Sequence, residues 1–471
     1  MLYRRVALSF LAFLAAVNVY RAATQAIAVD EAFAWQKMLN GSWRLMFLTF
    51  DACHHFLYTY LSWLSIHALG VSAFSLRLPA LLAGVLYFAA VYRVSLWLFG
   101  SSWRLLLAVA ALSLNPYILD FLSAARGYGL AMACLLWAFH ETFQAFSSAP
   151  ARLLRAALWL SFGVASNLTF LFPSLALVTV TLAASPLARR MAFRYLAAFL
   201  IPAAALIAVP LSHAKRDNFY YGSTKFEDTW NSLAEGSLLY PAPAILPPAW
   251  QSPYHSLVAQ IVHFMPWVVA ALGIPFAFAL FRAARARFQN PDSANLALLL
   301  SASTLAVTVA GLLAAHWIFA LVFPMDRTGI YLIPLVTLSA LAAAAGPLWP
   351  RAFQAALLLF LALFAAGFHT TYYRDWPYCR SLKQMLALAA AARPIGATVR
   401  LGGSFVFEPS LNFYRQTKHL SWYSPVLRAD PNAPADFYFF FDEDLAVIPR
   451  NHLRVLFQDS VSSAALAAPA K

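Results

Sequence analysis

The sequence has few charged residues and very few cysteines for its length. Only 11% of its 471 residues are Asp, Glu, Lys or Arg, whereas 62% are hydrophobic and the mean hydropathy is +0.66. Soluble chains rarely have this composition. The three cysteines are too few and too widely spaced for a disulfide framework or a zinc-ligand pattern, and we assign them no catalytic role.

The sequence also lacks an evident internal repeat and evident charges in the middle of its apolar runs. Transporters often consist of two related halves and carry ionisable residues at membrane depth, so both absences argue against a transporter. The net charge of +14 does not indicate a nucleic-acid partner, because the basic residues are scattered between apolar runs.

Apolar runs long enough to cross a bilayer, at about 20 residues per helix, recur as far as residue 371. We predict an α-helical polytopic membrane protein with about eleven transmembrane helices in residues 1–371. The start resembles a signal peptide, but the many following spans favour an uncleaved first helix. The stretch "FGVASNLTFLFP" fits either a tight turn or an interrupted helix. The expected spans are 6–26, 74–99, 104–120, 128–146, 155–168, 170–186, 193–212, 257–281, 295–318, 328–346 and 352–371.

Alternate connections between these spans carry the arginines, and such ends face the cytoplasm by the positive-inside rule. The N-terminus is then cytoplasmic and the C-terminus lies on the outer face, together with three larger segments at 27–73, 213–256 and 372–471. The arginines concerned are Arg4, Arg5, Arg93, Arg104, Arg152, Arg155, Arg189, Arg190, Arg194, Arg282, Arg285, Arg287 and Arg351.

The three outer segments differ in character. The segment 27–73 places aromatic residues at helical spacing, which favours two short helices lying in the membrane interface. The segment 213–256 mixes Pro, Gly, Tyr and Trp without a period, as in a functional or disordered loop, and its aromatics suit stacking against a sugar. Residues 372–471 predict a small α/β domain, with "SVSSAALAAPAK" as a disordered tail.

Candidate catalytic groups begin with Asp30 and Glu31, which follow directly after the first span. A carboxylate at this boundary suits a general base, although two acids there are also compatible with a simple marker of the water line. The outer side further offers Asp51, His54 and His55 in "FDACHHF". Histidines on an aromatic helix are often packing residues, and this spacing matches no strong metal motif.

Two further outer stretches supply cations. "SAARGYGLA" contains Arg126 and Tyr128, and "FPMDRTGIY" contains Arg327 after Asp326. Cations at membrane depth are costly unless they are paired or in use. Arg126 is also compatible with snorkelling to the interface, and Arg327 with a structural ion pair. If the bundle brings both arginines to one anion, a phosphate attached to a lipid is the natural candidate.

The order of three stretches carries a family resemblance: "VYRAATQAIAVDEAF", then "DACHHFLYTYLSWLSIHALGVSAFSLRLPALLAG", then "LNPYILDFLSAARGYGLAMACLLW". They resemble the GT-C class of integral-membrane glycosyltransferases. The likeness is to bacterial relatives of the dolichyl-phosphate-mannose protein mannosyltransferases and of the aminoarabinose transferases. It extends in outline through "DRTGIYLIPL" to the external tail.

The resemblance implies a role for each candidate. The family's acidic residue in the first outer loop corresponds to Asp30, the base that activates or orients the acceptor, with Glu31 as its catalytic neighbour. "DACHHFLY" lacks the paired prolines of the family's second motif, but its position implies that Asp51, His54 and His55 bind the donor. By the same resemblance, Arg126 and Tyr128 line the site and Arg327 faces the donor phosphate.

The implied reaction is transfer of a sugar from a polyprenyl-phosphate donor to a lipid, glycan or protein acceptor on the periplasmic face of a bacterial inner membrane. No cofactor is certain, and a divalent metal is compatible with the acids. A transporter or flippase for a lipid-linked sugar is the alternative, because it also needs a bundle and arginines for phosphate. A non-catalytic scaffold with an external binding domain is the third class.

Overall fold

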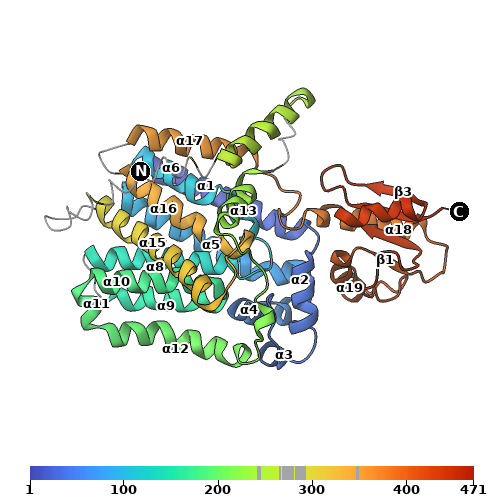
Figure 1. The fold of residues 1–471 in the computed structure, drawn as a ribbon, viewed down its shortest axis with the longest axis horizontal. Coiled ribbons are helices and arrows are strands. Elements are labelled where there is room, and N and C mark those ends of the chain that lie inside the picture. Colours follow the sequence, from blue (N-terminus) through green and yellow to red (C-terminus); the bar gives the residue numbers. More distant parts are fainter. Residues whose placement is uncertain are drawn as a thin grey trace. The chain divides into compact units, whose positions relative to one another are not determined.

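The chain is seen here as a computed structural model that describes residues 1–147, 149, 151–240, 246–264, 267, 281, 293–345 and 350–470. It divides into two compact units. Unit 1 comprises Met1–Asn18, Phe50–Tyr58 and Pro79–Phe368, and unit 2 comprises Val19–Thr49, Thr59–Leu78 and His369–Lys471. Figure 1 shows that the first is built from helices and that the second contains the strands.

Unit 1 is a helical bundle. Helix α8 packs against α9, which also packs against α12, and Figure 1 shows the three side by side. A second row is formed by α10, α15 and α16, which pack in that order. The bounds are α6 Trp103–Ser113, α7 Pro116–Phe121, α8 Tyr128–Ser147, α9 Arg152–Ser166, α10 Leu171–Ala184, α11 Pro186–Arg190, α12 Ala192–Leu211, α13 Phe226–Leu238, α15 Ser293–Phe319, α16 Leu332–Ala345 and α17 Pro350–Ala366.

Three further helices begin in one unit and end in the other: α1 (Leu2–Thr24), α4 (Phe56–Leu69) and α5 (Ala73–Phe99). Among the described residues, four helices are long and apolar enough to cross a membrane, namely α1, α5, α12 and α15. Shorter apolar helices of the bundle include α6 and α16. Most of the predicted span 257–281, and the arginines at 282, 285 and 287, lie outside the described residues.

Apart from 257–281, the predicted spans overlap helices of the described residues, with two refinements. The predicted span 104–120 is broken into α6 and α7, because Asn115 caps α7 by accepting from the N–H groups of Tyr117 and Ile118, and Pro116 follows it. The stretch "FGVASNLTFLFP" is an interrupted helix: α9 ends at Ser166 and a 3₁₀ turn, η2 (Leu168–Phe170), leads into α10.

The segment 213–256 contains regular structure that its sequence did not predict. Helix α13 spans Phe226–Leu238, and residues 248–264 are also helical. The buried face of α13 includes Thr229, Ser232, Gly236 and Ser237. These small and mostly polar residues share the buried face with Leu233 and Leu238, and the Pro- and Gly-containing sequence around the helix obscures its apolar positions. The prediction of a loop without a period is therefore wrong for these residues.

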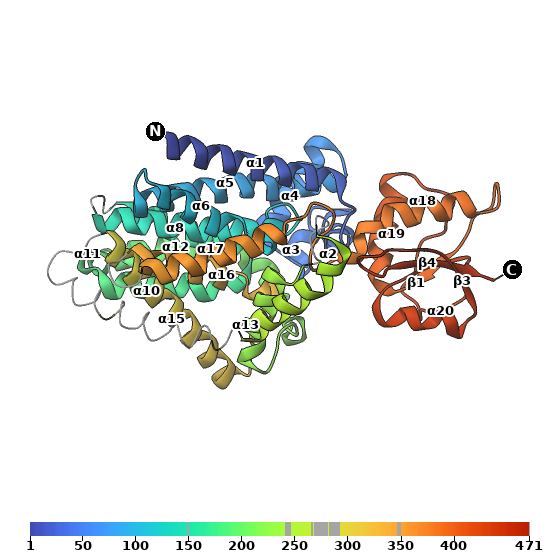
Figure 2. The same ribbon diagram turned by 90° about the horizontal axis from the view of Figure 1, so that it is seen from above.

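Unit 2 contains the predicted small α/β domain. Its sheet has the order β1-β2-β4-β3, with β1 (Leu401–Gly403) parallel to β2 (Phe437–Phe440) and the other neighbours antiparallel. Figure 2 shows α18 (Leu382–Ala392) and α19 (Glu408–Thr417) on one side of the sheet and the short α20 (Val447–Arg450) on the other.

The predicted disordered tail is instead part of this sheet. Strand β4 (Ala465–Pro469) lies between β2 and β3 (Leu453–Gln458), and Ala464 to Ala467 are fully buried. Alanine is uncommon in strands, which hides this one in the sequence. A central strand that is covered on both faces accepts small apolar side chains. The pairing of β4 with β2 and β3, rather than its own residue types, therefore makes it a strand.

The first outer segment belongs mainly to unit 2. Helix α2 (Val29–Ala34) continues directly into a π-helical turn, η1 (Trp35–Leu39), and α3 (Leu45–Leu48) and α4 follow. Helix α2 packs against α19 of the α/β domain, with the rings of Trp35 and Phe413 in edge contact at 5.0 Å. The two short helices predicted for this segment correspond to α2 with its continuation η1 and to α4, and the short α3 lies between them in the sequence.

Candidate functional site

Asp30 and Glu31 occupy the first turn of α2 in unit 2, where helix N–H groups favour carboxylates. The two side chains differ in exposure. Asp30 is half-buried, whereas Glu31 is 2% exposed. Glu31 also accepts a hydrogen bond from the backbone N–H of Ala28 at 2.8 Å, which caps the helix start. Of the two acids, Asp30 alone keeps solvent access.

The carboxylate of Glu31 is held by Arg77 of α5. Arg77 Nε donates to Glu31 Oε1 at 2.9 Å and Nη2 donates to Oε2 at 2.5 Å, with both side chains fully buried. A bidentate arginine–carboxylate pair fixes the orientation of both planes. Glu31 therefore serves as an acceptor for Arg77 and for its own helix.

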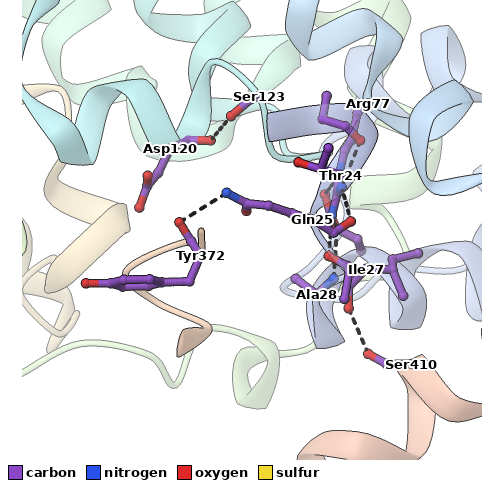
Figure 3. A network of polar contacts seen from close by, with 12 residues as sticks. Thr24, Gln25, Ile27, Ala28, Arg77, Asp120, Ser123, Tyr372 and Ser410 are labelled. Atoms are coloured by element: carbon purple, nitrogen blue, oxygen red, sulfur yellow. Dashed lines mark hydrogen bonds and ion pairs between the residues drawn. The ribbon is translucent and has the colours of Figure 1, made fainter. Parts of the chain in front are cut away.

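Arg77 also binds the C-terminal end of α1 and the two residues after it. Its Nη1 donates to the carbonyl oxygens of Ala22 and Gln25 at 3.1 and 3.0 Å, and its Nη2 donates to that of Ala26 at 2.7 Å. The last carbonyls of a helix lack partners within the helix and attract cations. Figure 3 shows Arg77 beside the Gln25–Ala28 segment that joins α1 to α2.

The α/β domain contacts the same segment from other directions. The N–H of Ile27 donates to the Tyr414 hydroxyl at 3.0 Å, and the Ser410 hydroxyl donates to the carbonyl of Ile27 at 3.2 Å. Lys383 Nζ donates to the carbonyl of Thr24 at 2.8 Å. The backbone that leads to Asp30 is thus bonded to side chains from α5, α18 and α19.

A second group of candidates lies in unit 1, around His55. The Asn167 amide oxygen accepts from the backbone N–H of Thr169 at 3.0 Å and from its hydroxyl at 2.8 Å, so the amide NH₂ faces His55. This NH₂ donates to His55 Nδ1 at 3.2 Å. Nδ1 is therefore the acceptor, and the neutral ring carries its proton on the buried Nε2.

Electrostatics also favour the neutral form of His55. Burial lowers the pKa of His55 well below its usual 6.5, and Arg126, His54 and Arg327 lower it further. The described residues acting on His55 are thus cationic or readily protonated side chains. Such a cluster, with a donor N–H at its centre, suits an anion.

The "ARGYG" stretch brings Arg126 and Tyr128 to His55 through close packing. The Tyr128 ring lies edge-on to the His55 ring at 5.0 Å, and Arg126 is 2% exposed. A Cβ on Gly127 would lie 2.0 Å from the Ser166 carbonyl oxygen and 2.8 Å from the Cβ of His55. Only glycine allows this approach, so Gly127 belongs to the site's architecture.

Arg327 lies in the 3₁₀ turn η4 (Asp326–Gly329), tied to the segment 213–256. Its guanidinium covers the Tyr221 ring at 5.0 Å, and the Tyr221 hydroxyl donates to Asp326 Oδ2 at 2.7 Å. The Asp326 N–H donates to the Ser232 hydroxyl at 2.8 Å. Asp326 has φ +49°, a conformation that a non-glycine residue keeps only where its surroundings impose it.

Asp51 has a local role in unit 1. Its Oδ1 accepts from the backbone N–H of Cys53 at 2.9 Å, and its carbonyl accepts from the N–H of His54 at 2.9 Å. These bonds form the turn that presents His54 and His55 at the start of α4. Within the described part of the chain, no three histidine, cysteine or acidic side chains form a group that could hold a metal ion.

The structure thus gathers His54, His55, Arg126, Tyr128 and Arg327 in unit 1, and Asp30 with Glu31 in unit 2. Sequence reasoning missed the residues that hold these groups. The one available signal was Arg77, a charged residue at the start of an apolar span, which needs a partner. The others carry no signal in one sequence; they are Asn167, Tyr221, Ser410 and Tyr414.

Comparison with solved structures bears on the fold. The crystal structure of ArnT from Cupriavidus metallidurans bound to undecaprenyl phosphate covers 98% of this chain and 97% of its own, with a TM-score of 0.50 and 13% identity. The chain has the GT-C fold. The apo state of the same ArnT matches over the same shares of both chains at 13% identity, with a TM-score of 0.46.

A structure of the mycobacterial arabinofuranosyltransferase AftD covers 98% of this chain and 42% of its own, at 16% identity and a TM-score of 0.43. No protein-family profile matches the sequence, and no curated protein matches it. The GT-C fold predicted from the sequence is confirmed. A shared fold does not by itself assign a reaction, which depends on the residues of the site.

Proposed function

We propose that the protein is a membrane glycosyltransferase that moves a sugar from a polyprenyl-phosphate donor to an acceptor on the periplasmic face. The observation that carries the proposal is the cationic cluster around neutral His55 within a GT-C fold. The solved ArnT with this fold was bound to undecaprenyl phosphate, which has the phosphate chemistry that such a cluster suits.

In the proposed reaction, the Asp30 carboxylate takes the proton of an acceptor hydroxyl. The resulting oxygen attacks the anomeric carbon of the donor sugar, a new C–O bond forms, and the bond from that carbon to the phosphate oxygen breaks. The electron pair of the broken bond stays on the polyprenyl phosphate. Arg126 and Arg327 stabilise this charge, because fixed cations favour a state in which negative charge develops.

The remaining candidates have supporting roles in this proposal. His55 donates through Nε2, His54 and Tyr128 line the donor side, and Asp51 holds the turn that carries the two histidines. The proposed location is a bacterial inner membrane, with the N-terminus cytoplasmic and the α/β domain periplasmic.

The test uses purified protein in nanodiscs, a panel of radiolabelled undecaprenyl-phosphate pentoses and hexoses, and membrane extract as acceptor. Wild type should transfer label, and Asp30→Asn should lower transfer by about two orders of magnitude because the base is lost. Asp430→Asn, an exposed acid on the α/β domain, is the matched control and should behave like wild type.

Near-normal transfer by a folded Asp30→Asn variant would remove Asp30 from the chemistry. Consumption of no donor by folded wild type would reject the enzyme. A transporter or flippase for a lipid-linked sugar would instead move label across a sealed vesicle without transferring it, and a scaffold would do neither.

A further inference from the structure

Many backbone groups at the junction of α1 and α2 are hydrogen-bonded to side chains. Between Ala22 and Ala28, five carbonyl oxygens accept from side chains: those of Ala22, Thr24, Gln25, Ala26 and Ile27. The N–H groups of Ile27 and Ala28 donate to the Tyr414 hydroxyl and to Glu31 Oε2. Unsupported links of this kind normally bond to water and move more freely.

Arg77 is the centre of this arrangement. Its donors make five bonds, two to Glu31 and three to backbone carbonyls, and its guanidinium also lies 5.3 Å from the Tyr373 ring centroid. A buried ion pair with ordinary geometry contributes little net stability, because desolvation of the charges is costly. A pair with every donor engaged instead fixes one geometry, which is what a reacting group requires.

We propose that Arg77 is a positioning residue for Asp30, acting through Glu31 and the Ala22–Ala26 carbonyls, and that Tyr414 and Ser410 of the α/β domain complete the same support. The inference rests on the proposed function, in which Asp30 is the base. It assigns the α/β domain a part in catalysis, since α19 holds the backbone three residues before Asp30.

This assignment also changes the role of Glu31. Both of its carboxylate oxygens accept hydrogen bonds, and its side chain is fully buried. A base needs an oxygen within reach of the acceptor hydroxyl. Glu31 therefore acts by orienting α2, and the adjacent, half-buried Asp30 carries out the proton transfer.

The test measures kcat and donor KM for Tyr414→Phe, Arg77→Lys and Asp30→Asn, with the same radiolabelled undecaprenyl-phosphate sugars. Tyr414→Phe removes one hydroxyl and keeps the ring. Each support variant should lower kcat about tenfold with donor KM unchanged, because the base is misplaced while the donor site is intact. Asp459→Asn, which breaks the Arg380–Asp459 pair elsewhere in unit 2, is the control and should keep wild-type kcat.

A double variant separates positioning from general weakening. If Tyr414 acts through Asp30, then Asp30→Asn with Tyr414→Phe should transfer no more slowly than Asp30→Asn alone, because the positioned group is already lost. Additive losses would overturn the proposal. Wild-type kcat in folded Tyr414→Phe and Arg77→Lys would overturn it as well.

Glu31→Gln tests the competing role. A loss equal to that of Asp30→Asn, together with wild-type rates in Tyr414→Phe, would make Glu31 the base and reject the inference. A tenfold loss that matches Arg77→Lys supports it. Failure of wild type to transfer any sugar is a separate result, which rejects the proposed function itself.

Discussion

At the scale of single residues, the neutral state of His55 connects structure and chemistry. The Asn167 amide fixes the tautomer, and the charges of Arg126 and Arg327 oppose protonation of the ring. A protonated ring would add a positive charge beside those of Arg126 and Arg327 and would lose its acceptor at Nδ1. His55 is therefore expected to stay neutral over the pH range in which the protein is folded.

Replacing His55 should change how stability depends on pH. Because the pKa of His55 is lowered in the folded protein, the unfolded chain binds a proton first as the pH falls below about 6.5, and wild type loses stability there. His55→Gln removes this contribution. Its melting temperature in detergent should fall less than that of wild type between pH 7.5 and 5.

The control is His213→Gln, which makes the same change at an exposed histidine outside the cluster. Equal slopes for His55→Gln and wild type would mean that His55 does not resist protonation in the folded protein.

The second residue-scale prediction concerns the donor phosphate. Arg327→Ala should lower kcat/KM for the lipid donor by about a hundredfold, because charge developing on the phosphate loses a fixed partner. Tyr221→Phe removes the hydroxyl bond to Asp326 but keeps the ring under Arg327, so its loss should be small. Equal losses in steady-state kinetics would show that the turn, rather than the charge, matters.

At the scale of elements, the sequence predicted most of the bundle because apolar runs report burial in the membrane directly. It did not predict α13, whose buried face mixes Leu233 and Leu238 with small polar residues such as Ser232. It also misread β4, where Leu466 stands among alanines. Both elements depend on the segments that pack against them, and these packing partners cannot be read from a single sequence.

The candidate site could be predicted from the sequence only in part. Residues with obvious chemistry, such as Asp30 and Arg126, stand out by their type and by their place beside an apolar run. The contacts that hold them do not: Arg77 and Glu31 lie 46 residues apart, and nothing local pairs them. Tertiary contacts select such partners, so they appear only in the folded chain.

Strand β4 yields a prediction for its element. Leu466 is fully buried in the centre of the sheet, so Leu466→Asp should destabilise the α/β domain by about 3 kcal/mol or more through an unpaired buried charge. Val455→Asp, on edge strand β3 and 44% exposed, is the matched control. Limited proteolysis should cleave the C-terminal domain faster in the first variant only, whereas a disordered tail would tolerate both changes equally.

At the scale of the whole molecule, the proposed reaction requires a particular topology. Donor and acceptor meet on the periplasmic face only if Asp30 and the α/β domain lie there, while the arginine-rich connections remain in the cytoplasm. With a cytoplasmic N-terminus, this arrangement needs an odd number of spans. Loss of one span from the predicted eleven would place the α/β domain on the wrong side of the membrane.

Cysteine labelling tests this parity. In a background with Cys53, Cys134 and Cys379 replaced by serine, a single cysteine is introduced at exposed Asp430 or at exposed Arg190. An impermeant maleimide should label Asp430→Cys in intact spheroplasts and label Arg190→Cys only after lysis. Labelling of both sites before lysis would reveal leaky cells, and the unsubstituted background controls for residual thiols.

The reverse pattern would place the α/β domain and its supports for Asp30 in the cytoplasm. A periplasmic reaction would then be impossible for this chain, although the fold and the cationic cluster would be unchanged. Labelling of both sites only after lysis would place both in the cytoplasm and thus require an even number of spans between Arg190 and Asp430, where five are predicted. In intact spheroplasts, the labelling of Asp430→Cys therefore assigns a side to the proposed chemistry independently of any activity measurement.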